Sequence, residues 1–231
     1  MRRITSSWEP DRSSIAAFDD LSYERGDEEV QTGSVAGNYN IVVIGASWGG
    51  LAALETIFPS LSRDLDVPIA VVLHRGVEST ERLSATLRRY TSLPVGDAQD
   101  KEALLPGHIY IAPPDYHLLV EAGTFALSTE APVCYARPSI DVLFESAADA
   151  YAERVLGVVL TGSSRDGAAG AARIKARGGR LMVQSPETAA SPVMPAAAIA
   201  AAPVDWILPL PEIGPKMSRL IGNDACLPTQ K

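Results

Sequence analysis

Short, continuous apolar runs alternate with segments of helical periodicity from about residue 39 onward. Buried strands are predicted where the apolar run is unbroken, at 41–45, 68–74, 155–160 and 180–184. Amphipathic helices are predicted over 50–58, 79–90, 140–151 and 168–177. Apolar strands that alternate with helices are typical of a parallel sheet covered on both faces. The pattern therefore predicts an α/β fold with a doubly wound, mostly parallel sheet flanked by helices.

The middle of the chain departs from this alternation. Residues 108–112 and 117–121 are strand-like, and a glycine-containing turn leads from the second segment into 125–128. This part predicts a small antiparallel hairpin between residues 108 and 128, inserted into the main sheet or added at its edge.

Residues with special backbone roles mark the helix ends and the loops. Ser139 is the predicted N-cap of helix 140–151. The pair Gly178-Gly179 ends the predicted helix 168–177. Prolines gather at 113–114 and 192–195, where they either frame a cleft or form rigid surface turns.

The first 37 residues differ from the rest of the chain. They lack a sustained apolar period and mix Ser, Asp, Glu and Arg, so residues 1–37 are predicted to be a disordered acidic tail. Residues 38–231 then form one folded domain of ordinary size. The whole chain has a formal net charge of −8, which argues against a nucleic-acid partner, because phosphate binding needs a basic face.

Targeting signals and cysteine chemistry indicate the compartment. No apolar stretch follows the basic N-terminus, and the longest weakly apolar stretch, 189–210, is interrupted by prolines and Asp205. Neither a secretory signal nor membrane insertion is predicted. Cys134 and Cys226 are far apart and at no metal-ligand spacing, which favours reduced thiols in a soluble, cytoplasmic protein.

Three predicted strands end in residues that can carry acyl-transfer chemistry. Ser47 follows strand 41–45, His74 ends strand 68–74, and Asp166 follows strand 155–160. The carboxyl ends of parallel strands meet at one edge of the sheet, where ligands bind. A nucleophile, a base and an orienting carboxylate are the groups that a serine esterase needs.

Ser47 lies in the motif GASWG, a G-x-S-x-G between a strand and a helix. Such a turn presents the hydroxyl, and the amide of Trp48 near the helix N-terminus could donate to an oxyanion. The same turn is also compatible with a simple glycine-rich helix entry or with phosphate binding. Nucleotide binding ranks lower, because the glycine pattern is G-x-S-x-x-G and the next strand ends in histidine rather than an acidic residue.

The base and the carboxylate have competing interpretations. Of the three histidines, His108 and His117 begin their strands, whereas His74 ends one and shares the edge with Ser47. Asp166 is equally suited to N-cap the helix that follows it. The chain order Ser, His, Asp differs from that of α/β-hydrolases, so that fold is not implied.

Five motifs in order resemble one known family. IGASWGG, the strand ending in His74, GHIYIAPPDYHLLVE, RPSIDVLFESAA and TGSSRDG are similar to the catalytic domain of chemotaxis protein-glutamate methylesterases of the CheB type. The resemblance covers roughly residues 39–210. It implies that Ser47, His74 and Asp166 form a catalytic triad and that no metal or cofactor is used. The implied substrate is a γ-glutamyl methyl ester on the cytoplasmic helices of a methylated chemoreceptor, with glutamine deamidation as a second activity.

The resemblance also implies an oxyanion and substrate pocket, for which the candidate residues are Ala46, Trp48, Gly49 and Ser163. Here the chain departs from the family. Many members have a small residue in place of Trp48, and the usual TGMG-x-DG is TGSSRDG, with Ser163 and Ser164 replacing Met and Gly. Residues 1–37 are too short for the phosphorylated receiver domain that many members carry. A non-catalytic adaptor of the same fold, binding receptors or signalling proteins, is the competing hypothesis.

Overall fold

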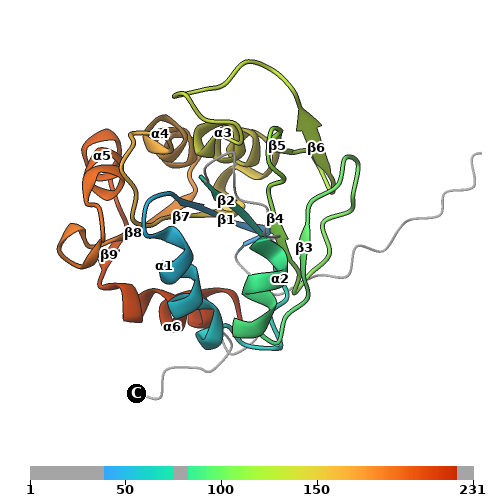
Figure 1. Ribbon diagram of the computed structural model, residues 1–231, viewed down its shortest axis with the longest axis horizontal. Coiled ribbons are helices and arrows are strands. Elements are labelled where there is room, and N and C mark those ends of the chain that lie inside the picture. Colours follow the sequence, from blue (N-terminus) through green and yellow to red (C-terminus); the bar gives the residue numbers. More distant parts are fainter. Residues whose placement is uncertain (1–38, 75–82, 223–231) are drawn as a thin grey trace, which may run out of the picture. The chain divides into compact units, whose positions relative to one another are not determined.

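The computed structural model describes residues 39–74 and 83–222 (Figure 1). The predicted acidic tail, residues 1–37, lies outside the described residues. So do Cys226 and residues 79–82, where the second helix is predicted to begin.

A seven-stranded sheet forms the centre of the domain. Every neighbouring pair in it is parallel, in the order β3-β4-β2-β1-β7-β8-β9. Its strands are β1 (Ile41–Ala46), β2 (Ile69–Leu73), β3 (Val95–Asp97), β4 (Ile109–Ile111), β7 (Val155–Val159), β8 (Arg180–Gln184) and β9 (Trp206–Leu208). The four apolar runs of the sequence are thus strands, as predicted, and β1, β2 and β7 are completely buried because helices cover both faces.

The antiparallel hairpin is present but smaller than predicted. It contains β5 (His117–Val120) and β6 (Phe125–Ser128), which form a separate two-stranded sheet. The segment near residue 108 does not belong to it: β4 pairs in parallel with β2 and β3 instead. The extended stretch at 108–112 therefore continues the main sheet, and that part of the hairpin prediction was wrong.

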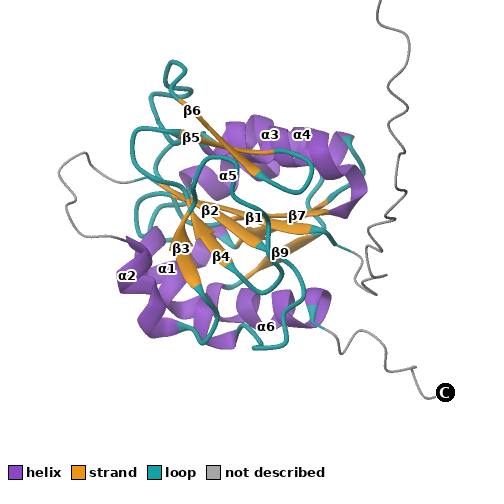
Figure 2. Ribbon diagram, turned by 90° about the vertical axis from the view of Figure 1, so that its right-hand side faces the viewer, coloured by secondary structure: helices purple, strands orange, loops and turns teal. Residues whose placement is uncertain are grey.

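Helices cover the sheet in two layers (Figure 2). The helices are α1 (Gly50–Ile57), α2 (Leu83–Leu87), α3 (Ile140–Tyr151), α4 (Ala168–Ala176), α5 (Val193–Ala201) and α6 (Leu210–Ile221). α1, α2 and α6 pack with one face of the sheet into one apolar cluster, and α3, α4 and α5 pack with the other face into a second. The fold is therefore doubly wound, as predicted. None of the described helices is long and apolar enough to cross a membrane.

The sequence predictions missed several elements in the last third of the chain. β9 is only three residues long, and prolines lie at the start of or within both α5 and α6. Pro192 is the N-cap residue of α5, which begins at Val193, and Pro195 lies in the first turn, where a missing amide hydrogen costs nothing. The prediction of a proline loop at 192–195 was therefore wrong.

The topology fixes where a site can form. β1 is central, with β2 on one side and β7 on the other. The β1–β2 connection carries α1 on one face, whereas the β7–β8 connection carries α4 on the opposite face. The strand order thus reverses beside β1, and a crevice at the carboxyl ends of β1, β2 and β7 is the expected ligand site of such a sheet.

Candidate active site

Ser47 lies at the carboxyl end of β1 on a turn that the TGSS loop supports from behind. The amide of Ser47 donates to the carbonyl of Thr161 (2.9 Å), and the hydroxyl of Thr161 donates to the carbonyl of Trp48 (2.9 Å). Gly49 follows with a φ of 78°, and a Cβ atom there would lie 2.6 Å from the methyl group of Ala190. The backbone therefore requires glycine at this position, and the turn is rigid while the Ser47 side chain remains half-buried.

The amide groups at the start of α1 are available to an anion. No described residue accepts a hydrogen bond from the backbone amide of Trp48 or Gly49, and both lie just before the N-terminus of α1. Unpaired amides at a helix N-terminus favour negative charge. The other two candidate pocket residues are placed differently. Ala46 is buried, and its carbonyl accepts the amide of His74 (3.0 Å). Ser163 is exposed and lines neither cleft pocket described below, whereas Ser164 lines one of them.

His74 lies beside Ser47 because of the strand register. β1 and β2 pair in parallel with Ala46 opposite Leu73, so the next residue of each strand is Ser47 and His74. The side chain of His74 is 15% exposed, and its Nε2 lies 2.8 Å from Oδ2 of Asp166. The Ser47 hydroxyl makes no hydrogen bond to the ring among the described residues, although both residues line the same pocket.

Asp166 is completely buried and accepts four hydrogen bonds. Oδ1 accepts the Ser139 hydroxyl (2.8 Å) and the amide of Asp141 (3.0 Å), and Oδ2 accepts His74 and the amide of Ile140 (2.7 Å). A carboxylate has about four lone-pair sites, so its acceptor capacity is filled.

The capping role of Asp166 differs from both cap predictions. It does not cap the helix that follows it, α4, which begins after Gly167 without a side-chain cap. Instead Asp166 binds the first two amides of α3, a helix that precedes it in the chain. Ser139 occupies the N-cap position of α3 but makes no capping bond, because its hydroxyl is turned to Asp166. One carboxylate thus both caps α3 and holds His74.

The electrostatics of Asp166 determine the tautomer of His74. Burial alone would raise the pKa of Asp166. The hydrogen bonds from His74, from the amides of Asp141 and Ile140 and from Ser139 outweigh burial and hold the pKa below its ordinary value. An ionised carboxylate can only accept, so Nε2 of His74 must carry the hydrogen in their bond. In the neutral ring Nδ1 is then unprotonated, and it is the nitrogen that can act as a base.

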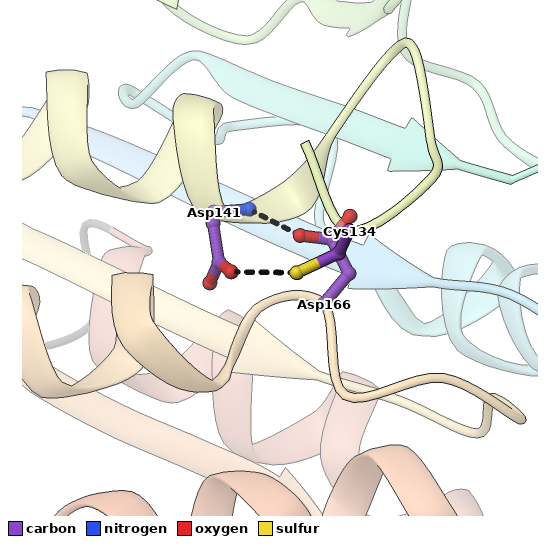
Figure 3. Close-up of side chains that lie close together, drawn as sticks. All are labelled: Cys134, Asp141 and Asp166. Carbon is purple, nitrogen blue, oxygen red and sulfur yellow. Dashed lines mark hydrogen bonds between the residues drawn. The ribbon is translucent and has the colours of Figure 1, made fainter. Parts of the chain in front are cut away.

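A second buried carboxylate lies next to Asp166. In Figure 3 the amide of Asp141 donates to Asp166, and the side chain of Asp141 accepts a hydrogen bond from the thiol of Cys134. The distance between Sγ of Cys134 and Oδ2 of Asp141 is 3.8 Å. Burial raises the pKa of Asp141 to about 6, with the charge of Asp166 acting in the same direction and the amide of Gly170 opposing it. Of these two neighbouring acids, Asp166 is therefore the one that ionises first.

Three potential metal ligands lie close together in this cluster. Cys134, Asp141 and Asp166 bring ligand atoms within 4.8 Å of one another. However, both oxygens of Asp166 are filled, and Oδ1 of Asp141 accepts the amide of Gly170 (2.7 Å). Burial and the nearby carboxylates raise the pKa of the Cys134 thiol, which disfavours the thiolate that metals bind. The donor set serves hydrogen bonding and does not fit a metal ion.

Two pockets share His74 in their lining. One, of about 400 Å³, is lined by Ser47, His74 and residues at the start of α1, including Trp48 and Gly49. The other, of about 410 Å³, is lined by His74, Ser164, Asp115 and the segment 132–138 without Val133. Because His74 lines both, we call them together the cleft.

Sequence reasoning missed the residues that surround Asp166. Ser139 was predicted only as a helix cap, Asp141 was given no role, and Cys134 was predicted only to be a reduced thiol. The only sequence signal was the RPSID segment of the family resemblance, which contains Ser139 and Asp141. Gly162 also belongs to the site: a Cβ atom there would lie 2.9 Å from Cβ of Ser47 and 2.6 Å from Cε of Met194.

Comparison with known proteins gives consistent matches. The family described as "CheB methylesterase" matches residues 42–217. A putative protein-glutamate methylesterase/protein-glutamine glutaminase of Leptospira interrogans is 42% identical over 188 residues, which are 81% of this chain and 97% of that protein. A protein-glutamate methylesterase/protein-glutamine glutaminase of Nocardioides is 40% identical over 191 residues, 81% of this chain but only 52% of that protein. The chain therefore spans nearly all of the first relative and about half of the second.

A solved structure is also similar. The crystal structure of the Thermotoga maritima CheB methylesterase catalytic domain matches with a TM-score of 0.76 and 35% sequence identity. The match covers 81% of this chain and 100% of that domain. The sequence and structural comparisons thus indicate the same kind of protein.

Proposed function

The chain belongs to the CheB methylesterase family, and from this premise we propose that it hydrolyses glutamate γ-methyl esters on chemoreceptors by a serine-esterase mechanism. The observation that carries the proposal is the bond between Nε2 of His74 and Asp166 at 2.8 Å, one strand away from the half-buried Ser47. Nucleophile, base and orienting carboxylate are then assembled from three strand ends.

The proposed reaction begins with proton transfer from Ser47 to Nδ1 of His74 as the serine oxygen attacks the ester carbonyl. Asp166 holds the Nε2–H and stabilises the imidazolium that forms. The amides of Trp48 and Gly49 donate to the tetrahedral oxyanion. His74 then returns the proton to the departing methoxy group, and methanol leaves an acyl-enzyme on Ser47.

Hydrolysis of the acyl-enzyme completes the cycle. Nδ1 of His74 takes a proton from water as the water attacks the acyl carbonyl, and the proton returns to Ser47 as the glutamate carboxyl is released. With a glutamine side chain, ammonia replaces methanol, which accounts for deamidation by the same groups. The absence of a Ser47–His74 bond is compatible with this scheme, because catalytic hydrogen bonds often tighten only when substrate binds.

The proposal is tested by methanol release from a methyl-esterified chemoreceptor cytoplasmic fragment. The wild-type protein should release methanol, and Ser47→Ala should release none above the uncatalysed rate. Equal release by the two proteins, or none by the wild type, would contradict the proposed function.

A further inference from the structure

The turn Val133–Ala136 forms part of the wall of the cleft beside His74. Its ends are joined by two backbone hydrogen bonds, from Val133 to Ala136 (3.1 Å) and from Ala136 to Val133 (2.9 Å). The two central residues, Cys134 and Tyr135, have φ values of 50° and 63°. Tight hairpin turns of this kind favour glycine or asparagine at positions with positive φ. Glycine at position 135 would therefore stabilise this turn more than Tyr135 does.

The side chain of Tyr135 does not contribute to the packing of the domain. It is 104% exposed, so it packs against no other part of the domain. An aromatic ring that is held in solvent on a strained backbone stabilises neither the turn nor the core. Strain of this type is characteristic of binding and catalytic sites.

A second exposed aromatic residue lines the other pocket of the cleft. Trp48 is 71% exposed and lines the pocket that contains Ser47, whereas Tyr135 lines the second pocket, which shares His74 with the first. Each of the two pockets that share His74 thus has one exposed aromatic residue in its lining. Each ring is carried by a turn whose backbone is fixed by hydrogen bonds.

We propose that Tyr135 and Trp48 determine substrate specificity by holding the polypeptide on both sides of the methyl-esterified residue. This inference rests on the proposed function. An ester carbonyl at Ser47 lies in one pocket, and His74 lines both, so the polypeptide that carries the ester would extend from the first pocket into the second. Apolar side chains that flank the esterified glutamate bury both rings, which gives a protein substrate contacts that a single esterified amino acid cannot make.

The test compares two substrates. One is N-acetyl-glutamate γ-methyl ester, and the other is a methyl-esterified chemoreceptor cytoplasmic fragment. The variants are Tyr135→Gly, Tyr135→Phe and Leu105→Ala. Leu105 is a matched control because it is 48% exposed and lines neither pocket. Thermal unfolding and sedimentation are measured for each variant.

Tyr135→Gly should unfold at a temperature equal to or above that of the wild type, because glycine relieves the positive φ. The ratio of kcat/KM on the fragment to kcat/KM on the small ester should fall about tenfold, mainly through KM, which corresponds to one lost apolar anchor. Tyr135→Phe keeps the ring and should retain most of the ratio, and Leu105→Ala should leave it unchanged.

Several outcomes would overturn the inference. The ratio could be unaltered in Tyr135→Gly, or both substrates could lose activity equally, as expected for a purely structural turn. A change from dimer to monomer in Tyr135→Gly would show that a second copy of the chain, rather than substrate, covers the ring. Wild-type protein that cleaves neither ester would instead contradict the proposed function itself.

Discussion

Ser47 lies on a turn that is held through its backbone, whereas Asp166 is held through its carboxylate, by donors that lie 25 to 92 residues away in the chain. The Ser47 hydroxyl makes no hydrogen bond to a described residue, and its turn is fixed by backbone bonds and by Gly49. The carboxylate of Asp166 accepts four bonds and joins α3 to the end of β2. The side chain of Ser47 is thus expected to serve catalysis without stabilising the fold, whereas the side chain of Asp166 is expected to do both.

Ser47→Ala should have the largest effect on activity and almost none on stability. Turnover of an ester substrate should fall by at least about a thousandfold, because the nucleophile is lost. The free energy of unfolding in urea should change by no more than about 0.5 kcal/mol, since no hydrogen bond is removed. Activity within tenfold of the wild type would contradict the assignment of the nucleophile.

Asp166→Asn should reduce both the turnover of the ester substrate and the free energy of unfolding. The NH2 group of asparagine would replace one carboxylate oxygen and present hydrogens to donors, leaving one of the two buried α3 amides unpaired. A destabilisation of about 2–4 kcal/mol is expected in urea unfolding, together with a loss of turnover approaching that of Ser47→Ala. If Asp166→Asn unfolds like the wild type, the four-bond network does not stabilise the fold as described.

Gly162→Ala should disturb the serine side sterically. The added methyl group would meet Met194 and Cβ of Ser47, so stability should fall by roughly 1–3 kcal/mol and turnover should also fall. Gly96→Ala is the control, because nothing lies within 4 Å of a Cβ atom at that position. Equal behaviour of the two variants, in urea unfolding and ester hydrolysis, would argue against close packing behind Ser47.

Asp141→Asn should have the smallest effect, visible in the pH dependence of stability. The pKa of Asp141 is raised to about 6, so its folded state binds a proton more tightly than the unfolded state. Its contribution is complete below the ordinary pKa and is lost as pH rises through about 6. Between pH 5 and pH 8 the wild type should lose roughly 1 kcal/mol relative to Asp141→Asn.

The control for this measurement is Gly96→Ala, which removes no titratable group and should keep the pH dependence of the wild type. The titration of Asp166 does not interfere with the comparison of wild type and Asp141→Asn. Its pKa is lowered, so its own contribution is lost only as pH falls below its ordinary range. A difference between wild type and Asp141→Asn that is the same at both pH values would contradict the raised pKa.

The same contrast explains what could be predicted from the sequence. β1, β2, β7 and α1 follow from apolar periodicity and a glycine-rich turn, which are local properties, and the parallel sheet follows from their alternation. The strand-end rule then brought Ser47, His74 and Asp166 to one edge, and the structure joins the last two by a hydrogen bond. These predictions needed only short stretches of chain.

The predictions failed where tertiary contacts override local signals. Asp166 before Gly167 suggests a local N-cap, but tertiary packing brings the N-terminus of α3 within hydrogen-bonding distance instead. Likewise, α5 begins directly after Pro192, which suggested a loop, and β4 joins the main sheet although it precedes a hairpin. The environment of Asp141 and the exposure of Tyr135 depend on three-dimensional packing, which no sequence period reports.

The central claim, that Ser47 is a nucleophile activated by His74, is tested most directly by covalent labelling. The protein is treated with a fluorophosphonate probe, digested, and mapped by mass spectrometry, alongside Ser47→Ala and His74→Ala. The account predicts rapid labelling confined to Ser47, none in Ser47→Ala, and labelling slowed by at least about a hundredfold in His74→Ala. Folded wild-type protein that is not labelled at Ser47 would contradict the account and favour a non-catalytic adaptor of the same fold.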